Sequence, residues 1–341
     1  MQPILSIVIP VYKTPLDSLQ NCLNSVLEIT SFPIEVVCVL DSPGDLCEQF
    51  LDNFVVNTSK ITLLKNSTNK GAAFSRNKGL KAVSGQYVTF VDADDRIDSR
   101  VYEYAIKIIK LHNLDLLTLG TRKEENIIET EKEVLSIDLN QPSNELLLPL
   151  IRHLGMSSCG ILYNRNYLLE KKLIYPMNLI HNEDFVFVTK VLCTRPKVAL
   201  IYKQGYYIVG HPNSVCRSIK TARRYIDSSL AAIYILRTLV ESQYAFPLSC
   251  LRWYLSVVFS QCFQDMDVIK ILQGEEQKQF SLNIVIVCKY LINNFNYLLT
   301  FPCRLLISII EKRPLTMFST FHITYYSIKL LMKINYHLNK Y

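Results

Sequence analysis

Apolar positions in the first 120 residues repeat with two spacings, one typical of strands and one typical of amphipathic helices. Four short runs have the β-branched and aromatic content of buried strands: residues 6–11, 34–40, 61–64 and 87–91. Residues 16–27 carry an apolar stripe at helical spacing behind the helix start Thr14-Pro15, and residues 71–83 predict a second helix. This alternation predicts an α/β fold with a doubly wound, mainly parallel sheet.

The pattern changes beyond residue 120. Residues 121–145 are charged and aperiodic, which indicates a variable insertion or linker. Strand-like and helix-like segments resume over residues 146–218, which we expect to complete the α/β domain begun by residues 1–120. Residues 219–341 are rich in Leu, Ile and Tyr and predict a helical C-terminal extension.

Basic charge gathers near the C-terminus. The net charge is +7, and residues 303–341 hold six Lys or Arg against the single acid Glu311. With its aromatic and aliphatic residues, this segment favours peripheral membrane contact over nucleic-acid binding, and no nucleic-acid partner is expected. An ordinary helical subdomain with a solvated basic face is the alternative. The uncharged run between Lys289 and Arg304 is shorter than the roughly 20 apolar residues of a membrane span.

Composition narrows the class of protein. With 49% hydrophobic residues among 341, the chain can form a sizeable core and is not largely disordered. No basic, apolar leader precedes the first predicted strand, so a cytoplasmic protein is expected. The ten cysteines show neither a C-x-x-C pair nor zinc-site spacing, which predicts reduced, buried thiols.

Three carboxylates follow the fourth predicted strand, at Asp92, Asp94 and Asp95. Open α/β sheets bind ligands at the carboxyl ends of their strands, and strand geometry directs Asp92 and Asp94 to the same side. Two such oxygen donors suit Mg²⁺ or Mn²⁺, which can in turn hold a diphosphate. The alternative is a solvated acidic turn that caps the helix expected near Asp98.

Five separated motifs resemble, in order, those of the nucleotide-sugar-dependent glycosyltransferases of family 2. The motifs are IVIPVYK, EVVCVLDSPGD, NKGAAFSRNKGLKAVSGQYVTFVDADD, HNEDFVF and YYIVGHPNSVCRS. The resemblance covers residues 4–218 and implies a GT-A fold. It places the nucleotide-sugar-binding half in residues 1–120 and the acceptor-side half in residues 146–218.

The resemblance implies a donor site at the carboxyl ends of the first strands. Pro10 and Tyr12 would lie near the nucleotide base, and Asp41 would contact it. Leu40 departs from the family pattern, which has a further acid at this position. This departure weakens any assignment of the nucleotide, although a UDP-sugar is preferred to a GDP- or dTDP-sugar.

The longest motif implies the residues that handle the rest of the donor. Arg76 would lie near the nucleotide, Asp92 near the ribose, and Asp94 would bind the cation with Asp92. His211 would approach the metal or the diphosphate. The alternatives are that Arg76 is a helix-surface arginine paired with an acid, that His211 is a surface loop residue, and that Asp95 supports or caps the turn.

Glu183-Asp184 matches the acid pair that the family places on the acceptor side. An acceptor hydroxyl is a weak nucleophile, so a carboxylate within hydrogen-bond reach is needed to take its proton. Asp184 is preferred over Glu183 as this general base. A pair of acids in a first helical turn also complements the helix dipole, and this is the alternative.

These inferences predict an inverting glycosyltransferase that uses Mn²⁺ or Mg²⁺ and a nucleotide diphosphate sugar. The acceptor would be a hydroxyl of a surface polysaccharide or lipid-linked glycan, reached from the cytoplasmic face of the inner membrane. A nucleotidyltransferase is disfavoured because no Gly-rich loop with a lysine lies near the N-terminus. A catalytically silent scaffold of a glycan assembly complex is disfavoured by the clustered, mutually repelling carboxylates, although Leu40 keeps it open.

Overall fold

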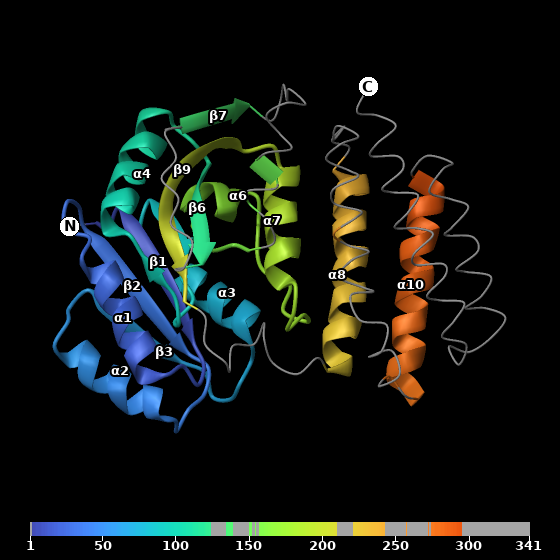
Figure 1. The fold of residues 1–341 in the computed structure, drawn as a ribbon, viewed down its shortest axis with the longest axis horizontal. Coiled ribbons are helices and arrows are strands. Elements are labelled where there is room, and N and C mark those ends of the chain that lie inside the picture. The colour runs from blue at the N-terminus through green and yellow to red at the C-terminus, as the bar shows by residue number, and fades with distance from the viewer. Residues whose placement is uncertain are drawn as a thin grey trace. The chain divides into compact units, whose positions relative to one another are not determined.

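The computed structural model describes residues 2–123, 134–138, 150–151, 154, 157–209, 221–242, 257, 272 and 274–294. The chain divides into two compact units, Met1–Ser218 and Ile219–Tyr341. Figure 1 labels most of the described helices and strands of both. All the predicted site residues except His211 belong to the described part of the first unit, and His211 lies outside the described residues.

A mixed, mainly parallel sheet is the framework of the first unit (Figure 1). Its described strands are β1 Leu5–Val11, β2 Ile34–Leu40, β3 Ile61–Lys65, β4 Tyr87–Phe90, β5 Arg96–Ile97, β6 Leu116–Lys123, β7 Val134–Asp138, β8 Ile161–Asn164 and β9 Lys197–Ile208. They are ordered β3-β2-β1-β4-β8-β6-β9-β5, and β7 pairs with β9. Strands β3, β2, β1 and β4 run parallel, whereas β8 enters antiparallel to β4 and β6. The parallel part brings the carboxyl ends of four strands to one edge.

Helices cover both faces of this sheet, which confirms the doubly wound prediction. The helices of the first unit are α1 Leu16–Leu27, α2 Leu46–Val56, α3 Ala72–Ala82, α4 Ser99–Leu111, α6 Arg165–Glu170 and α7 Glu183–Cys193. Buried residues of α1, α2 and α4 join Ile7 and Cys38 in one core cluster. On the opposite face, α3 packs closely on β1, because a Cβ at Gly79 would overlap the side chain of Val8. Phe187 of α7 meets the rings of Phe90 and Tyr163 edge to face, with centroids 6.1 Å and 5.7 Å apart respectively.

The strand and helix limits that were predicted agree with the structure to within a residue or two, and α2 and β7 are among the elements that were missed. Helix α2 buries only Cys47 and Leu51, so its apolar stripe is too narrow to indicate a helix. The aperiodic segment expected to be an insertion or linker contains β7 and the end of β6. These residues form strands because β9 offers a pairing edge, which is a tertiary effect that periodicity does not report.

The described part of the second unit contains the helices α8 Ala222–Glu241 and α10 Gly274–Asn294, which pack on each other. The side-chain amide of Asn283 donates a 2.9 Å hydrogen bond to the buried hydroxyl of Ser229 between them. C-terminal helices are therefore present, as predicted. Among the helices in the described ranges, none has both the length and the apolar character needed to cross a bilayer. The basic segment at residues 303–341 lies outside the described residues.

Candidate active site

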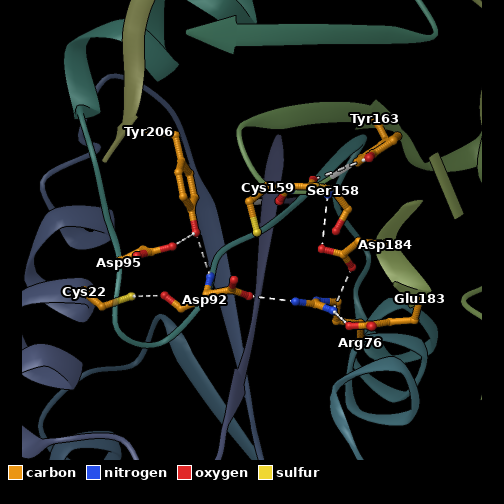
Figure 2. Close-up of polar contacts among 11 residues, drawn as sticks. Cys22, Arg76, Asp92, Asp95, Ser158, Cys159, Tyr163, Glu183, Asp184 and Tyr206 are labelled. Carbon is orange, nitrogen blue, oxygen red and sulfur yellow. Dashed lines mark hydrogen bonds and ion pairs between the residues drawn. The ribbon is translucent and has the colours of Figure 1, made fainter. Parts of the chain in front are cut away.

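One buried arginine joins acids from two distant parts of the chain (Figure 2). Arg76, in the middle of α3, is only 4% exposed. Its Nη2 lies 2.8 Å from Oδ1 of Asp92, which is the second residue after β4. Its Nη1 lies 2.9 Å from Oε1 of Glu183 and 2.9 Å from Oδ1 of Asp184, at the start of α7. The structure therefore brings the predicted donor-side acid and the predicted acceptor-side pair around a single guanidinium.

Aromatic side chains form the apolar surroundings of this cluster. Tyr175 stacks on Phe187 with ring centroids 4.0 Å apart, and the guanidinium carbon of Arg76 lies 5.4 Å from the centroid of the Tyr175 ring. The side chain of Asn77 both donates to the carbonyl of Tyr175 and accepts from its amide, each at 2.9 Å. These two hydrogen bonds hold the segment before α7 against α3. The buried rings lower the local dielectric and strengthen the ion pairs beside them.

Burial changes the protonation of the acid pair. It raises the pKa of Glu183 to about 7, and the charge of Asp184 adds to the rise while Arg76 opposes it. Burial also raises the pKa of Asp184, against the opposing effects of Arg76 and of the Ser158 amide, which donates to Oδ2 at 3.3 Å. The acid pair therefore binds and releases a proton near neutral pH, where a carboxylate can serve as a general base.

The acids after β4 differ in their exposure. The side chain of Asp92 is 38% exposed, and Asp94 is half-buried. Asp95 is only 5% exposed, and its two oxygens accept hydrogen bonds from the hydroxyl of Tyr206 at 2.7 Å and the amide of Val209 at 2.9 Å. Asp95 therefore holds groups of the protein, as the supporting role predicts, and Asp98 is the acid that caps α4.

The described residues fit a hard divalent cation shared with a substrate. Within the ranges that the structure describes, no three Asp, Glu, His or Cys side chains converge as a ready metal cage. Mg²⁺ and similar ions, however, keep several waters and are commonly bound by one or two carboxylates together with substrate phosphates. Asp92 and Asp94 supply such a partial set, and His211 lies outside the described residues.

The residues predicted to bind the base gather at the carboxyl ends of β1 and β2. Tyr12 is 41% exposed just after β1, and Pro10 lies within β1 opposite Val39. Pro10 has no amide N–H to donate. Because β1 extends beyond the last residue of β4 at this position, no hydrogen bond between the two strands is lost. Their contacts with a base stay predictions.

Asp41 has a structural role that the sequence did not predict. It is 3% exposed, and its carboxylate accepts from the amides of Lys70 at 2.8 Å and Gly71 at 2.7 Å and from the side-chain amide of Asn66 at 2.8 Å. These bonds tie the end of β2 to the turn that starts α3. Asp41 therefore helps to set the position of Arg76 one and a half turns later, and its predicted contact with the base is untested.

Comparison with known proteins identifies the domain that carries this site. Residues 6–168 match the family model described as glycosyl transferase family 2. The domain formed by these residues is a glycosyltransferase family 2 domain. It is 26% identical over 191 residues to the uncharacterized glycosyltransferase EpsJ of Bacillus subtilis, across 55% of this chain and 54% of EpsJ. It is also 27% identical over 206 residues to a poly(ribitol-phosphate) beta-glucosyltransferase of Bacillus spizizenii, across 60% of this chain and 32% of that protein.

Solved structures agree on the fold of this family 2 member. TarS 1-349 of S. aureus in complex with UDP has a TM-score of 0.67 at 18% identity, covering 89% of this chain and 87% of TarS 1-349. The same protein has also been solved with UDP-GlcNAc, with a TM-score of 0.66 at 19% identity. The GT-A-type fold is therefore confirmed, and so is the predicted resemblance of this domain to glycosyltransferase family 2. The chain spans about half the length of EpsJ and a third of the glucosyltransferase.

Sequence reasoning missed several residues that shape the candidate site of this family 2 domain. Asn77 directly follows Arg76 in the longest motif, and Ser158 lies in the segment that leads into the second half of the domain. Tyr206 belongs to the aromatic strand of the last motif. Their motifs carried a signal, but only the fold shows that Asn77 holds Tyr175 and that Tyr206 reaches Asp92 and Asp95.

Proposed function

We propose that this family 2 member is an inverting, metal-dependent glycosyltransferase that moves a sugar from a UDP-sugar to a hydroxyl of a surface polysaccharide or lipid-linked glycan. One observation carries the proposal most directly. The guanidinium of Arg76 contacts Asp92 on one side and Glu183 and Asp184 on the other. A donor held beside Asp92 would therefore present its sugar within a few ångströms of the acid pair.

The reaction is a single displacement. The acceptor hydroxyl attacks the anomeric carbon, its proton passes to a carboxylate of the acid pair, and the bond from that carbon to the diphosphate breaks. Attack from the side opposite the leaving group inverts the anomeric configuration. Asp92 and Asp94 would hold the cation, which would stabilise the charge on the departing diphosphate.

Asp184 is the stronger candidate for the base. The Ser158 amide and Arg76 both donate to its carboxylate, and both interactions favour the ionised form. Glu183 accepts from the same Nη1 of Arg76, and its pKa of about 7 leaves it substantially protonated near neutral pH. Because the two acids repel each other, one proton on Glu183 supports a negative charge on Asp184.

The contacts of Arg76 support a further role beside the nearness to the nucleotide that the resemblance implies. Arg76 is buried, and both of its terminal nitrogens are taken up by carboxylates. It therefore acts in the proposed reaction by neutralising and orienting the three acids. A direct contact with the nucleotide is not needed for this role.

The choice of donor and acceptor rests on relatives. UDP and UDP-GlcNAc are the ligands in the TarS structures, and a poly(ribitol-phosphate) glucosyltransferase is named for a surface polymer. These names support a UDP-sugar donor and a polymeric or lipid-linked acceptor. We place the enzyme at the cytoplasmic face of the membrane, where its basic C-terminal segment would make peripheral contact.

Calorimetric titration of the full chain tests the donor site. UDP, GDP and dTDP are titrated with Mn²⁺ and with chelator into the parent, Asp94→Ala and the exposed control Asp17→Ala. We expect Mn²⁺-dependent binding of UDP by the parent and by Asp17→Ala, and its loss in Asp94→Ala. Binding of no nucleotide by the folded parent would refute the proposal and favour the silent scaffold.

Transfer and hydrolysis of UDP-sugars test the base. Asp184→Asn is expected to lower kcat by about 10²- to 10⁴-fold, while the affinity for UDP with Mn²⁺ stays within about twofold of the parent. Glu183→Gln keeps the hydrogen-bonding shape of the protonated glutamic acid and is expected to lose much less. A larger loss of kcat in Glu183→Gln than in Asp184→Asn would exchange the two roles.

A further inference from the structure

Building on the proposed donor site, we infer that Tyr206 and Asp95 are positioning residues that hold the turn carrying Asp92 and Asp94, and that neither contacts the donor or the cation. Figure 2 shows the two side chains meeting beside Asp92. They come from distant segments, since Tyr206 lies on β9 and Asp95 follows β4. Neither has a role in the reaction as derived above.

The turn is closed by its own backbone and by the phenol of Tyr206. The amide of Asp95 donates to the carbonyl of Asp92 at 3.0 Å. The amide of Asp92 donates to the hydroxyl oxygen of Tyr206 at 3.1 Å, and that hydroxyl donates to Oδ2 of Asp95 at 2.7 Å. Because a phenol has a single proton, its direction is set: it accepts from Asp92 and donates to Asp95.

The remaining oxygen of Asp95 extends the network to the end of β9. Oδ1 accepts from the amide of Val209 at 2.9 Å. Tyr206 is 1% exposed and Asp95 is 5% exposed, whereas the side chain of Asp92 is 38% exposed. Asp95 is thus buried, and both of its oxygens accept hydrogen bonds from the protein. It therefore acts on a ligand only through Asp92 and Asp94.

The network requires a carboxylate at position 95. Two donors face this side chain, and an asparagine would turn an N–H toward one of them. A buried acid beside two others is costly, and the need for two acceptors at this point explains its presence.

Loss of the Tyr206 hydroxyl leaves the buried amide of Asp92 without its acceptor and releases one side of Asp95. The turn then has more than one accessible arrangement, and the carboxylates of Asp92 and Asp94 are no longer held in a common geometry. A cation bound by two carboxylates and a diphosphate is sensitive to that geometry. The expected loss falls on metal-dependent binding of the donor and spares contacts with the base.

The test compares Tyr206→Phe with Tyr207→Phe in the full chain. Tyr207 is the next residue on β9, is half-buried and points to the opposite face, so it is a matched control. Hydrogen exchange of the amides of residues 88–97 reports on the turn. Electron paramagnetic resonance measures binding of Mn²⁺ alone, and calorimetry measures binding of UDP with Mn²⁺ and with chelator.

We expect Tyr206→Phe to exchange the Asp92 amide about tenfold faster than the parent, as for one lost hydrogen bond. Its affinity for UDP with Mn²⁺ should fall about tenfold, and affinity in chelator should not change. In turnover, KM for the donor should rise more than kcat falls. Tyr207→Phe should match the parent in every measurement.

The inference is overturned if the Asp92 amide exchanges equally fast in Tyr206→Phe and the parent, or if both bind Mn²⁺ and UDP equally well. If the parent binds Mn²⁺ but no nucleotide, the proposed donor is wrong, while exchange and Mn²⁺ affinity still decide the roles of Tyr206 and Asp95. Asp95→Asn serves as the second variant if Tyr206→Phe does not fold. It should show the same faster exchange, and parent-like exchange would count against the inference.

Discussion

Replacing Arg76 with methionine is expected to destabilise the first compact unit by about 3–5 kcal/mol at pH 8. The change removes the cation from a buried cluster and leaves Glu183 and Asp184 without their counterion. Methionine keeps much of the volume of the arginine stem, so the cavity left behind is small. The predicted loss is therefore electrostatic in origin.

The magnitude follows from the exposure of each partner. The side chains of Glu183 and Asp184 are 11% and 16% exposed, so their charges are poorly solvated once Arg76 is lost. Breaking a buried pair by removing one partner typically costs about 3–5 kcal/mol. Asp92, at 38% exposure, is screened by water and adds little. Arg76→Lys should lose less, because an ammonium keeps the charge but cannot reach all three acids in the same geometry.

Urea unfolding of the full chain measures this loss, followed by the near-ultraviolet circular dichroism of its tyrosines. Lys65→Met is the matched control, since Lys65 also contacts two acids, Glu48 and Asp52 at 2.8 Å each, but is 38% exposed. It should cost much less, because water and salt screen an exposed ion pair. At pH 5 the deficit of Arg76→Met should shrink, because protonation of the acid pair relieves the uncompensated charge. Equal losses for Arg76→Met and Lys65→Met at pH 8 would refute the reasoning.

Two further predictions concern single acids. Because the pKa of Glu183 is raised from 4.5 to about 7, the folded state keeps a proton that the unfolded chain releases, and stability should fall as the pH rises from 4.5 to 7. Glu183→Gln should remove this part of the slope when urea midpoints are compared at pH 5 and pH 8, and an unchanged slope would contradict the assignment. Asp41→Asn should cost about 1–3 kcal/mol in thermal unfolding, because an amide N–H would face one of the donors that Asp41 now accepts. The exposed acid change Asp52→Asn is its control, and an equally small loss in both would remove the anchoring role of Asp41.

The comparison of prediction and structure separates local from long-range information. The strands β1, β2 and β4 and the helix α1 were predicted because each carries a complete apolar pattern within its own residues. The strand β7 was missed because its pairing partner β9 lies about 60 residues further along the chain. Periodicity reports burial of a segment, and it does not report which distant edge the segment will join.

The amino-acid sequence by itself determined the family resemblance, the doubly wound sheet and the acids on which the proposed chemistry depends. Those features are local, because a strand followed by carboxylates, or a helix that begins with an acid pair, is formed by consecutive residues. The tertiary structure alone decided what these acids contact. It places Arg76 between Asp92 and Asp184, although Arg76 and Asp184 are 108 residues apart in the chain.

The same distinction applies to Asp95 and Asp41. The sequence could not tell whether each of these carboxylates faces a ligand or holds other groups of the protein. Their roles depend on donors brought in by other segments, Tyr206 and Val209 for Asp95 and the turn before α3 for Asp41. A carboxylate becomes a ligand or a support according to which groups surround it after folding. That environment is created by packing between distant segments, and it is therefore decided by the tertiary structure.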